Sequence, residues 1–315
     1  MKDILIKKND AGQRLDKFIR KTFPDMPQSL LYRAIRTRHI KLNGKRPEPS
    51  DRLCEGDTLC IFLSDDVLTK KTKAVTQLPA VDVVYEDENI MLVNKPVGLS
   101  VHEDETDNPD TLIARIINML TKSGQYDPKE ENSFAPALCN RLDRNTCGIV
   151  IVAKTAQALR IMNKMIAERR LSKRYLCLVH GLPEQKSATL KAYIRKDTQK
   201  KHSYVTDNPT KGALTMLTKY SVIKSDGNIS LLSVELLTGR THQIRAHMAH
   251  IGHPLVGDGK YGSNELYRKS GHRWQALCAH SLTFRFNGEG ESLNYLDGMT
   301  FSVPEPDFVN EIKQQ

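Results

Sequence analysis

Short apolar runs that are joined by turns, rather than by regularly spaced helices, are the feature of this sequence that most limits its fold. Runs of five to eight residues, rich in β-branched and aliphatic side chains, occur within residues 81–315. The dipeptide Asp226-Gly227 between two of them is typical of a hairpin turn. Because hairpins build antiparallel sheets, the pattern predicts an α+β fold on a mixed, largely antiparallel sheet. The predicted strands are residues 81–85, 90–94, 149–153, 175–180, 217–223 and 230–237.

Three amphipathic segments in the same region predict helices that flank this sheet. Residues 110–122, 155–169 and 241–251 carry apolar side chains at three- and four-residue intervals. Gly252 and Pro254 follow the last segment and are typical helix stop signals. None of these helices is preceded by a glycine-rich phosphate loop that follows a predicted strand, so the sequence predicts no nucleotide cofactor.

A separate small domain is predicted for residues 1–63, with two helices followed by a small sheet. The dipeptide Asn43-Gly44 predicts a tight turn, and Ser29 is the expected cap of the second helix. Residues 64–80 are polar and lack periodicity, so we expect a linker there and a second domain over residues 81–315. The elements expected in the small domain are helices at 12–21 and 29–38 and strands at 40–42 and 57–63.

The charge of the chain is concentrated in this first domain. The whole chain has 47 lysines and arginines against 37 acidic residues, a net charge of +10. Residues 1–63 contain fourteen of the basic and eight of the acidic residues. A one-sided excess favours a polyanionic partner such as nucleic acid, although a solvated helix face is the plain alternative. The candidate RNA-binding residues here are Arg14, Lys17, Arg33, Arg36, Arg38 and Lys41.

The sequence contains no run of apolar residues that could cross a membrane. The longest, residues 148–153, is far shorter than the roughly 20 residues of a bilayer span, and residues 1–7 do not resemble a signal peptide. The six cysteines form no Cys-x-x-Cys pair, which favours free thiols in a reducing compartment. We therefore expect a cytoplasmic protein, monomeric and without a membrane partner.

The densest polar cluster is residues 139–148, which lead directly into a predicted buried strand. Asp143 lies between Arg141 and Arg144, and the positive charges favour its ionised form. Gly148 permits a close approach of the backbone. The cluster is a candidate for a reactive carboxylate, and a loop salt bridge without chemistry is the alternative.

Two further clusters could contribute to the same chemistry. In residues 169–179, Lys173 and Arg174 precede Tyr175, and basic residues beside an aromatic ring suit an RNA backbone with a stacked base. In residues 237–254, Arg245 borders the apolar stripe of a predicted helix and could point into a cleft. Four histidines of this segment suggest zinc, but their spacing matches no known ligand motif, so we predict no metal.

The sequence resembles two known families. The segment "GQRLDKFIRKTFPDMPQSLLYRAIRTRHIKLNGKRPEPSDRLCEGDTLCIF" is similar to the ribosomal-protein-S4-like RNA-binding domain. Residues 81–315 resemble the RluA-type RNA pseudouridine synthases through five ordered motifs. These are "VYEDENIMLVNKPVGLSVH", "NRLDRNTCGIVIVAK", "SKRYLCLVHG", "LLTGRTHQIRAHMAHIGHPLVGDGKYG" and "CAHSLTF".

This resemblance assigns expected roles to particular residues. Asp143 stands where the catalytic aspartate belongs, Arg245 would pair with it, and Tyr175 would stack on the flipped base. Arg141 would hold phosphate or support the loop. The chain departs from the family pattern at Asn140, usually histidine, and at Cys147, usually serine.

The resemblance implies an isomerase that converts uridine to pseudouridine in structured RNA and needs neither cofactor nor metal. Large-subunit ribosomal RNA is the expected substrate, with transfer RNA as the other candidate. Two alternatives are a catalytically inactive RNA-binding ribosome assembly factor and a metal-dependent hydrolase that uses the histidines. The sequence determines neither the target uridine nor whether Asp143 attacks the sugar, attacks the base or acts as a base.

Overall fold

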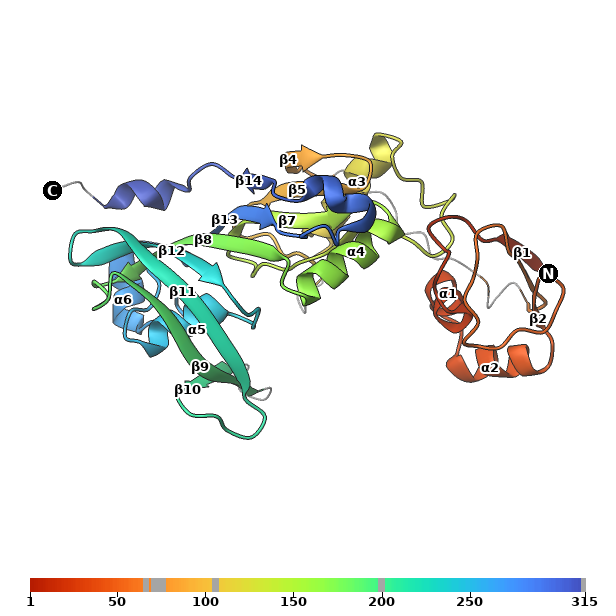
Figure 1. Ribbon diagram of the computed structural model, residues 1–315, viewed down its shortest axis with the longest axis horizontal. Helices are drawn as coiled ribbons and strands as arrows, with labels where there is room; N and C mark the ends of the chain where they lie inside the picture. The colour runs from red at the N-terminus through yellow and green to blue at the C-terminus, as the bar shows by residue number, and fades with distance from the viewer. Residues whose placement is uncertain (65–67, 69–77, 104–107, 198–201, 313–315) are drawn as a thin grey trace. The chain divides into compact units, whose positions relative to one another are not determined.

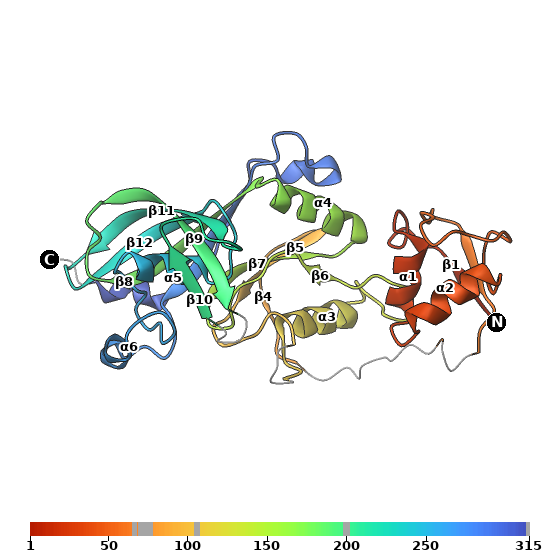
Figure 2. The same ribbon diagram turned by 90° about the horizontal axis from the view of Figure 1, so that it is seen from below.

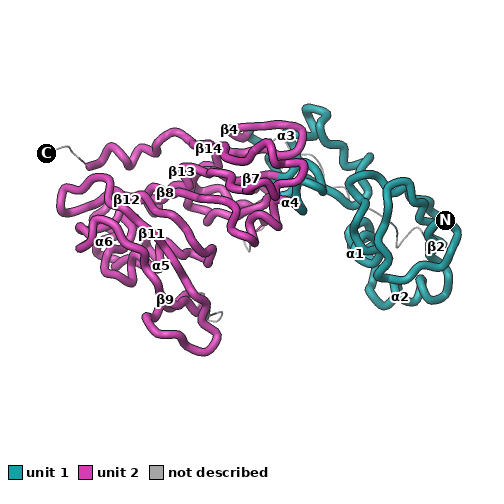
Figure 3. The backbone as a smooth tube through the Cα atoms, in the orientation of Figure 1, with its two compact units in different colours: residues 1–80, 113–137, 153–160 teal, residues 81–112, 138–152, 161–315 magenta. Residues whose placement is uncertain are grey.

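The computed structural model describes residues 1–64, 68, 78–103, 108–197 and 202–312. The chain divides into two compact units, shown in Figure 3. Unit 1 comprises residues 1–80, 113–137 and 153–160, and unit 2 comprises residues 81–112, 138–152 and 161–315. Residues 65–67 and 69–77 of the expected linker lie outside the described residues, and the boundaries at 63 and 80 stay a prediction.

The N-terminal part of unit 1 is a three-stranded antiparallel sheet with two helices. The strand order is β1-β3-β2, with β1 at Lys2–Leu5, β2 at Ile40–Leu42 and β3 at Thr58–Ile61. The helices α1 (Leu15–Thr22) and α2 (Gln28–Arg36) bury apolar faces, as their periodicity predicts. Their core includes Leu15, Phe18, Ile19, Leu31 and Ile35, all at most 2% exposed.

Two details of this region differ from the sequence-based expectation. α2 begins at Gln28 after Pro27 and has no side-chain cap, so the expected cap at Ser29 is wrong. Proline at this position supplies the extended backbone from which the helix starts. The strand β1 was not expected because its four residues, two charged followed by two apolar, show no alternation.

Unit 1 also includes a polar cluster centred on Asp10. This side chain is fully buried and accepts hydrogen bonds from Asn132 Nδ2 at 2.8 Å and Ser133 Oγ at 2.7 Å. Asn9 Nδ2 donates to Glu131 at 2.8 Å. These bonds satisfy polar groups that would otherwise be buried without partners.

A large mixed sheet forms the second, larger part of the fold (Figures 1 and 2). Its strand order is β10-β9-β11-β12-β8-β13-β7-β5-β4, with β14 on β13 and β6 on β7. Neighbouring pairs from β10 to β13 are antiparallel, whereas β13 and β7 run parallel. The α+β class with a largely antiparallel sheet is therefore confirmed. The strands are β4 (Asp82–Glu86), β5 (Ile90–Lys95), β6 (Ala137–Leu138), β7 (Cys147–Ala153), β8 (Leu171–His180), β9 (Ser187–Asp197), β10 (His202–Thr206), β11 (Leu214–Ser225), β12 (Ile229–Leu236), β13 (Leu277–Phe284) and β14 (Thr300–Ser302).

The helices expected from periodicity form close to their expected bounds, but some elements were missed. α3 is Leu112–Lys122, α4 is Ala156–Ala167 and α5 is Gln243–His250, and α6 (Asn264–Ser270) was not expected. The 3₁₀ helices Glu291–Leu296 and Asp307–Glu311 were also missed. No helix in the described part of the chain combines the length and apolar character that a bilayer span requires.

Candidate active site

Asp143 and Arg245, which are 102 positions apart in the sequence, form an ion pair in unit 2. Arg245 Nη1 donates to Asp143 Oδ2 at 3.0 Å. Asp143 belongs to the loop that leads into β7, and Arg245 lies on α5. The side chain of Asp143 is 29% exposed and that of Arg245 only 9%, so the carboxylate can meet a substrate while its counter-charge stays inside the fold.

Arg245 is itself fixed by a second carboxylate, Asp258. Arg245 Nε donates to Asp258 Oδ2 at 2.7 Å and Nη2 donates to Oδ1 at 2.9 Å, a two-pronged pair. The Asp258 side chain is fully buried and also accepts bonds from the backbone N–H groups of Lys260 and Tyr261. Burial opposes ionisation of Asp258, but Arg245 and these N–H groups outweigh it and lower its pKa below the usual value. The guanidinium is thereby oriented with its remaining edge toward Asp143.

Two glycines allow the backbone to close around these carboxylates. Gly148 has a φ of +111°, and a Cβ there would lie 2.3 Å from the carbonyl oxygen of Ala279 on β13. Gly257 has a φ of +74°, and a Cβ would lie 2.2 Å from the carbonyl oxygen of Trp274. A side chain at either position would push apart the segments that hold Asp143 and Asp258.

A histidine and a tyrosine border the ion pair on another side. His242 Nε2 lies 3.7 Å from Asp143 Oδ2, and its Nδ1 is hydrogen-bonded to the Tyr261 hydroxyl at 3.1 Å. The Tyr261 ring lies beside the Arg245 guanidinium, 5.4 Å from centroid to Cζ. Burial lowers the pKa of His242 despite the nearby carboxylate, so this side chain is largely neutral at pH 7.

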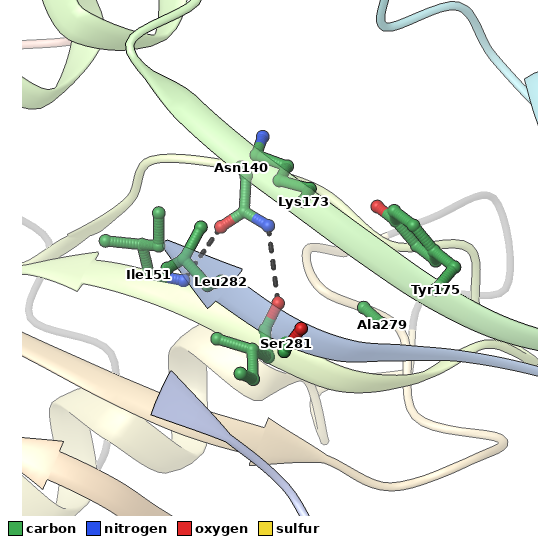
Figure 4. A pocket seen from close by; sticks show the side chains of 8 residues that line it. Asn140, Ile151, Lys173, Tyr175, Ala279, Ser281 and Leu282 are labelled. Carbon is green, nitrogen blue, oxygen red and sulfur yellow. Dashed lines mark hydrogen bonds between the residues drawn. The ribbon is translucent and has the colours of Figure 1, made fainter. Parts of the chain in front are cut away.

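Tyr175 lies in a small pocket on one face of the sheet (Figure 4). It projects from β8 and is 7% exposed. Burial, followed by the charge of Asp143, raises the pKa of Tyr175 above its usual value, so it stays a neutral phenol at neutral pH. The pocket is lined by Asn140, Ile149, Ile151, Lys173, Tyr175, Ala279, Ser281 and Leu282.

Asn140 is bonded to the neighbouring strand rather than aimed at open space. Its Oδ1 accepts from Ile151 N at 2.7 Å, and its Nδ2 donates to Ile149 O at 3.4 Å (Figure 4). The amide therefore ties the start of the loop that carries Asp143 to β7. Asn140 occupies the position where the family that the sequence resembles usually has histidine, and both ends of its amide are used in these two bonds.

The two basic residues before Tyr175 separate because side chains alternate along a strand. Lys173 shares the pocket with Tyr175, and burial lowers its pKa. Arg174 is exposed on the opposite face, where it is paired in register with Glu235 of β12. The structure thus brings Lys173, but not Arg174, to the pocket that contains Tyr175.

The arginines on either side of Asp143 also differ. Both are exposed, but Arg144 is tied to the neighbouring loop, because its Nε donates to the carbonyl oxygen of Gly98 at 3.0 Å. The buried Lys95 supports the same place, because its Nζ donates to the carbonyl oxygens of Pro96, Leu99 and Arg144 at 2.8 to 2.9 Å. Burial is the main cause that lowers the pKa of Lys95 to about 8.

Lys95 should make the stability of the protein rise with pH in the alkaline range. An unfolded lysine keeps its proton up to about pH 10.4, whereas folded Lys95 loses it at about pH 8, so the unfolded state binds more protons between these values. The free energy of unfolding of the wild type should therefore increase relative to Lys95→Met by up to about 1.4 kcal/mol per pH unit over that window. Denaturant unfolding of both proteins at pH 7, 8, 9 and 10 measures this difference in free energy. The difference between the wild type and Lys191→Met, which replaces an exposed lysine on β9, should not change with pH. A difference for Lys95→Met that also does not change with pH would contradict the prediction.

The histidines of residues 242–253 have separate partners. His247 bonds to Thr218 at 2.9 Å, His250 to Asp207 at 2.7 Å and His253 to the carbonyl oxygen of His180 at 2.9 Å. Across the described residues, His, Cys, Asp and Glu side chains form no group of three that could hold a metal ion. The geometry accordingly gives no support to the hydrolase alternative.

The basic residues of the N-terminal region are mostly exposed on unit 1. Lys17, Arg33, Arg36 and Arg38 are exposed. Arg14 is instead paired with Asp16, its Nη2 2.7 Å from Oδ2. Lys41 is half-buried, with its Nζ 5.4 Å from the centroid of the Phe62 ring.

Sequence reasoning selected Asp143, Tyr175 and Arg245 but missed four residues of this site. Asp258 and Tyr261 follow α5 in the segment Gly257-Asp258-Gly259-Lys260-Tyr261, where an acid between two glycines was the available signal. Lys95 carried no such signal, since a single lysine is common on any surface, and His242 was considered only as one of four histidines whose spacing fits no metal motif. Their roles depend on contacts between segments far apart in the chain.

The chain is similar to known proteins along most of its sequence. A family model described as RNA pseudouridylate synthase matches residues 89–250, and one described as S4 domain matches residues 13–59. The protein named ribosomal large subunit pseudouridine synthase C of Buchnera aphidicola subsp. Baizongia pistaciae is 32% identical over 89% of this chain and 88% of its own length. The Escherichia coli K12 protein of that name is 29% identical over 92% of this chain and 90% of its own. The solved structure of human RNA pseudouridylate synthase domain containing 1 shares the fold, with a TM-score of 0.56 and 23% identity over 75% of this chain and 87% of that one.

Proposed function

The chain belongs to the RNA pseudouridylate synthase family, and from this premise we propose that it converts uridines of large-subunit ribosomal RNA to pseudouridine with Asp143 as the reactive group. The observation that carries the proposal is the half-exposed carboxylate of Asp143, held 3.0 Å from an arginine that a buried aspartate fixes in place. The relatives named above act, by their names, on the large ribosomal subunit.

The reaction breaks the bond between ribose C1′ and uracil N1, turns the base and joins C1′ to C5. The proton on C5 leaves and N1 gains one, so no electrons or groups are exchanged with a cofactor. An ionised carboxylate can start it by attacking C1′, by attacking the uracil ring or by removing a proton from the sugar. Arg245 orients the Asp143 carboxylate through its hydrogen bond in each of these routes.

Tyr175 is suited to hold the base while it turns. A target uridine must leave the RNA stack, which costs a few kcal/mol that contacts in the enzyme have to offset. The buried phenol supplies a flat stacking surface and one hydroxyl group. Because its pKa is raised, Tyr175 is a neutral phenol and not a phenolate. It can therefore accept the proton from C5 only if it gives up its own hydroxyl proton in the same step.

The remaining candidates would hold the RNA. Lys173 brings a positive charge into the pocket of Tyr175, and the exposed Arg141 can reach a phosphate next to the target. Lys17 of α1 and the exposed Arg33 and Arg36 of α2 would bind the backbone of the same RNA. We propose that the protein acts as a monomer in the cytoplasm.

The test of this function is the release of tritium from RNA labelled at C5 of uridine. The full-length protein is incubated with an unmodified large-subunit ribosomal RNA transcript, and a transfer RNA transcript is the comparison. We expect release from the ribosomal transcript alone. Release from transfer RNA alone would correct the substrate, and binding without release from either would favour the assembly-factor alternative.

The exposed arginines of α2 should make RNA binding depend on salt. Each phosphate contact contributes about 0.7 to 0.9 to the slope of log affinity against log salt, so Arg33→Gln with Arg36→Gln should lower that slope by about 1.5. Filter binding of the ribosomal transcript at four salt concentrations measures it. The matched control is Arg20→Gln with Lys21→Gln on α1, whose slope should stay at the wild-type value. Equal slopes in both double variants would exclude α2 as the binding face.

A further inference from the structure

A basic and aromatic surface lies on unit 2 in residues 260–274, which, apart from Lys260 and Tyr261, lie outside the site described above. These residues contain four lysines and arginines against one glutamate. All seven residues of α6 are at least partly exposed, and Ser263 caps the helix. Figure 2 draws α6 projecting from the body of unit 2. We define the α6 surface as Arg268, Lys269, Arg273 and Trp274, all of which are exposed.

Trp274 is the feature of this surface that a solvated loop does not explain. It is the single tryptophan of the chain and is 36% exposed. The guanidinium of Arg273 lies 4.9 Å from the centroid of its ring. An aromatic face with a cation beside it is the combination that stacks a base and holds the neighbouring phosphate of single-stranded RNA.

The basic residues of the surface are not equivalent. Lys269 Nζ donates to Glu265 at 2.6 Å, so its charge is largely matched within α6. Arg268 and Arg273 are therefore the residues with the greater capacity to meet an anion. They lie on either side of the turn that Gly271 makes after α6.

The α6 surface is joined to both carboxylates of the active site through short contacts. The backbone of Trp274 packs against Gly257, the residue before Asp258. The next residue, Gln275, donates from Nε2 to Thr146 Oγ1 at 3.3 Å, and Thr146 N donates to the carbonyl oxygen of Asp143 at 3.0 Å. RNA bound here would therefore lie beside the catalytic loop.

We propose that the α6 surface binds single-stranded RNA next to the target uridine, with a base on Trp274 and phosphates on Arg268 and Arg273. This inference rests on the proposed function, because it assumes that the substrate is RNA. A base-stacking aromatic among arginines favours nucleic acid over an acidic protein or a membrane surface. The surface would hold the strand that must open when the uridine is flipped out.

Tryptophan fluorescence tests the proposal without any substitution. Because Trp274 is the only tryptophan, its selectively excited emission reports on this surface alone. We titrate the full-length protein with the unmodified large-subunit ribosomal RNA transcript and, separately, with a short oligouridine. We expect quenching that saturates together with binding measured by filter retention. Saturated binding of both RNAs with unchanged emission would overturn the proposal.

Paired variants give a second and independent test. Arg268→Gln with Arg273→Gln should lower the salt slope of RNA binding by about 1.5 and raise KM about tenfold, with kcat within about twofold of the wild type. Trp274→Leu should raise KM similarly, and Trp274→Phe should restore most of it. Lys191→Gln with Lys224→Gln, exposed residues of β9 and β11, is the matched control and should change neither quantity.

The outcomes separate this proposal from the proposed function. Absence of tritium release by the wild type would count against the proposed function, while the fluorescence titration would still decide whether RNA meets Trp274. If the wild type is active and the Arg268→Gln, Arg273→Gln double variant keeps the salt slope and the KM of the control, RNA does not bind to the α6 surface. The proposed activity would be unaffected by that result.

Discussion

Asp143→Asn should abolish pseudouridine formation, lowering turnover by at least about 10⁴-fold, while RNA affinity stays within about threefold of the wild type. A neutral amide has the shape of the carboxylate but can neither attack the nucleoside nor accept a proton from it. The buried pair of Arg245 with Asp258 does not depend on Asp143, so the variant should fold normally. Single-turnover tritium release and filter binding on the same RNA measure the two quantities.

Asp226→Asn is the matched control for this substitution. Asp226 lies in the β11–β12 hairpin, where its Oδ1 accepts backbone bonds from Asn228 and Ile229 at 2.9 Å. Its replacement should leave turnover unchanged. Near-normal turnover in Asp143→Asn would remove Asp143 from the chemistry, and a large loss of RNA affinity would make it a binding residue instead.

Arg245→Met should reduce turnover by two or more orders of magnitude and should also destabilise the fold by about 3–5 kcal/mol. The substitution leaves the fully buried Asp258 without its partner and Asp143 without its counter-charge. Urea unfolding and single-turnover tritium release measure these effects.

The stability loss has its own pH signature. The lowered pKa of Asp258 means that its ion pair stabilises the wild type at neutral pH, and that this contribution is lost only as pH falls below the ordinary carboxyl range. Acid unfolding of Arg245→Met should therefore begin at higher pH than in the wild type. Arg245→Lys keeps the charge without the two-pronged geometry, so it should recover the stability toward acid better than the rate.

Arg170→Met removes another arginine–carboxylate pair and controls for the loss of charge. Arg170 Nη2 lies 2.7 Å from Glu289 Oε1, with both side chains partly exposed. Surface pairs of this kind contribute little, so its free energy of unfolding should change by no more than about 1 kcal/mol. Equal losses of stability in the two variants would show that Arg245 does not hold a buried carboxylate, and near-normal turnover in Arg245→Met would show that it does not support Asp143.

The sequence pattern predicts the strands on which the site is built because those strands are buried and apolar. Residues 149–153 and 175–180 stand out as apolar runs, and both form strands next to β13 in the sheet. β13 itself was missed, since His280 and Ser281 interrupt its apolar residues. Its pairing with β7 brings together positions more than a hundred residues apart, which no local pattern reports.

The roles of single residues likewise divide into those that the sequence predicts and those that depend on contacts between distant segments. The family motifs identify Asp143, Tyr175 and Arg245, but they do not show that Arg245 shares its guanidinium between two aspartates. The alternation of a strand, rather than composition, places Lys173 and Arg174 on opposite faces. The bonds of Asn140 to β7 could not be inferred either, because they require the three-dimensional proximity of the loop and the strand.

The position of β13 has a consequence for synthesis of the protein. This strand is among the last elements of the chain, yet it lies between β8 and β7 in the middle of the sheet. Until residue 284 has left the ribosome, the two halves of the sheet have no strand to join them, and Gly148 has no Ala279 against which to close. Contacts so distant in sequence form late in folding. The S4-domain segment of a growing chain is therefore synthesised well before the loop that holds Asp143 can take its final place in the sheet.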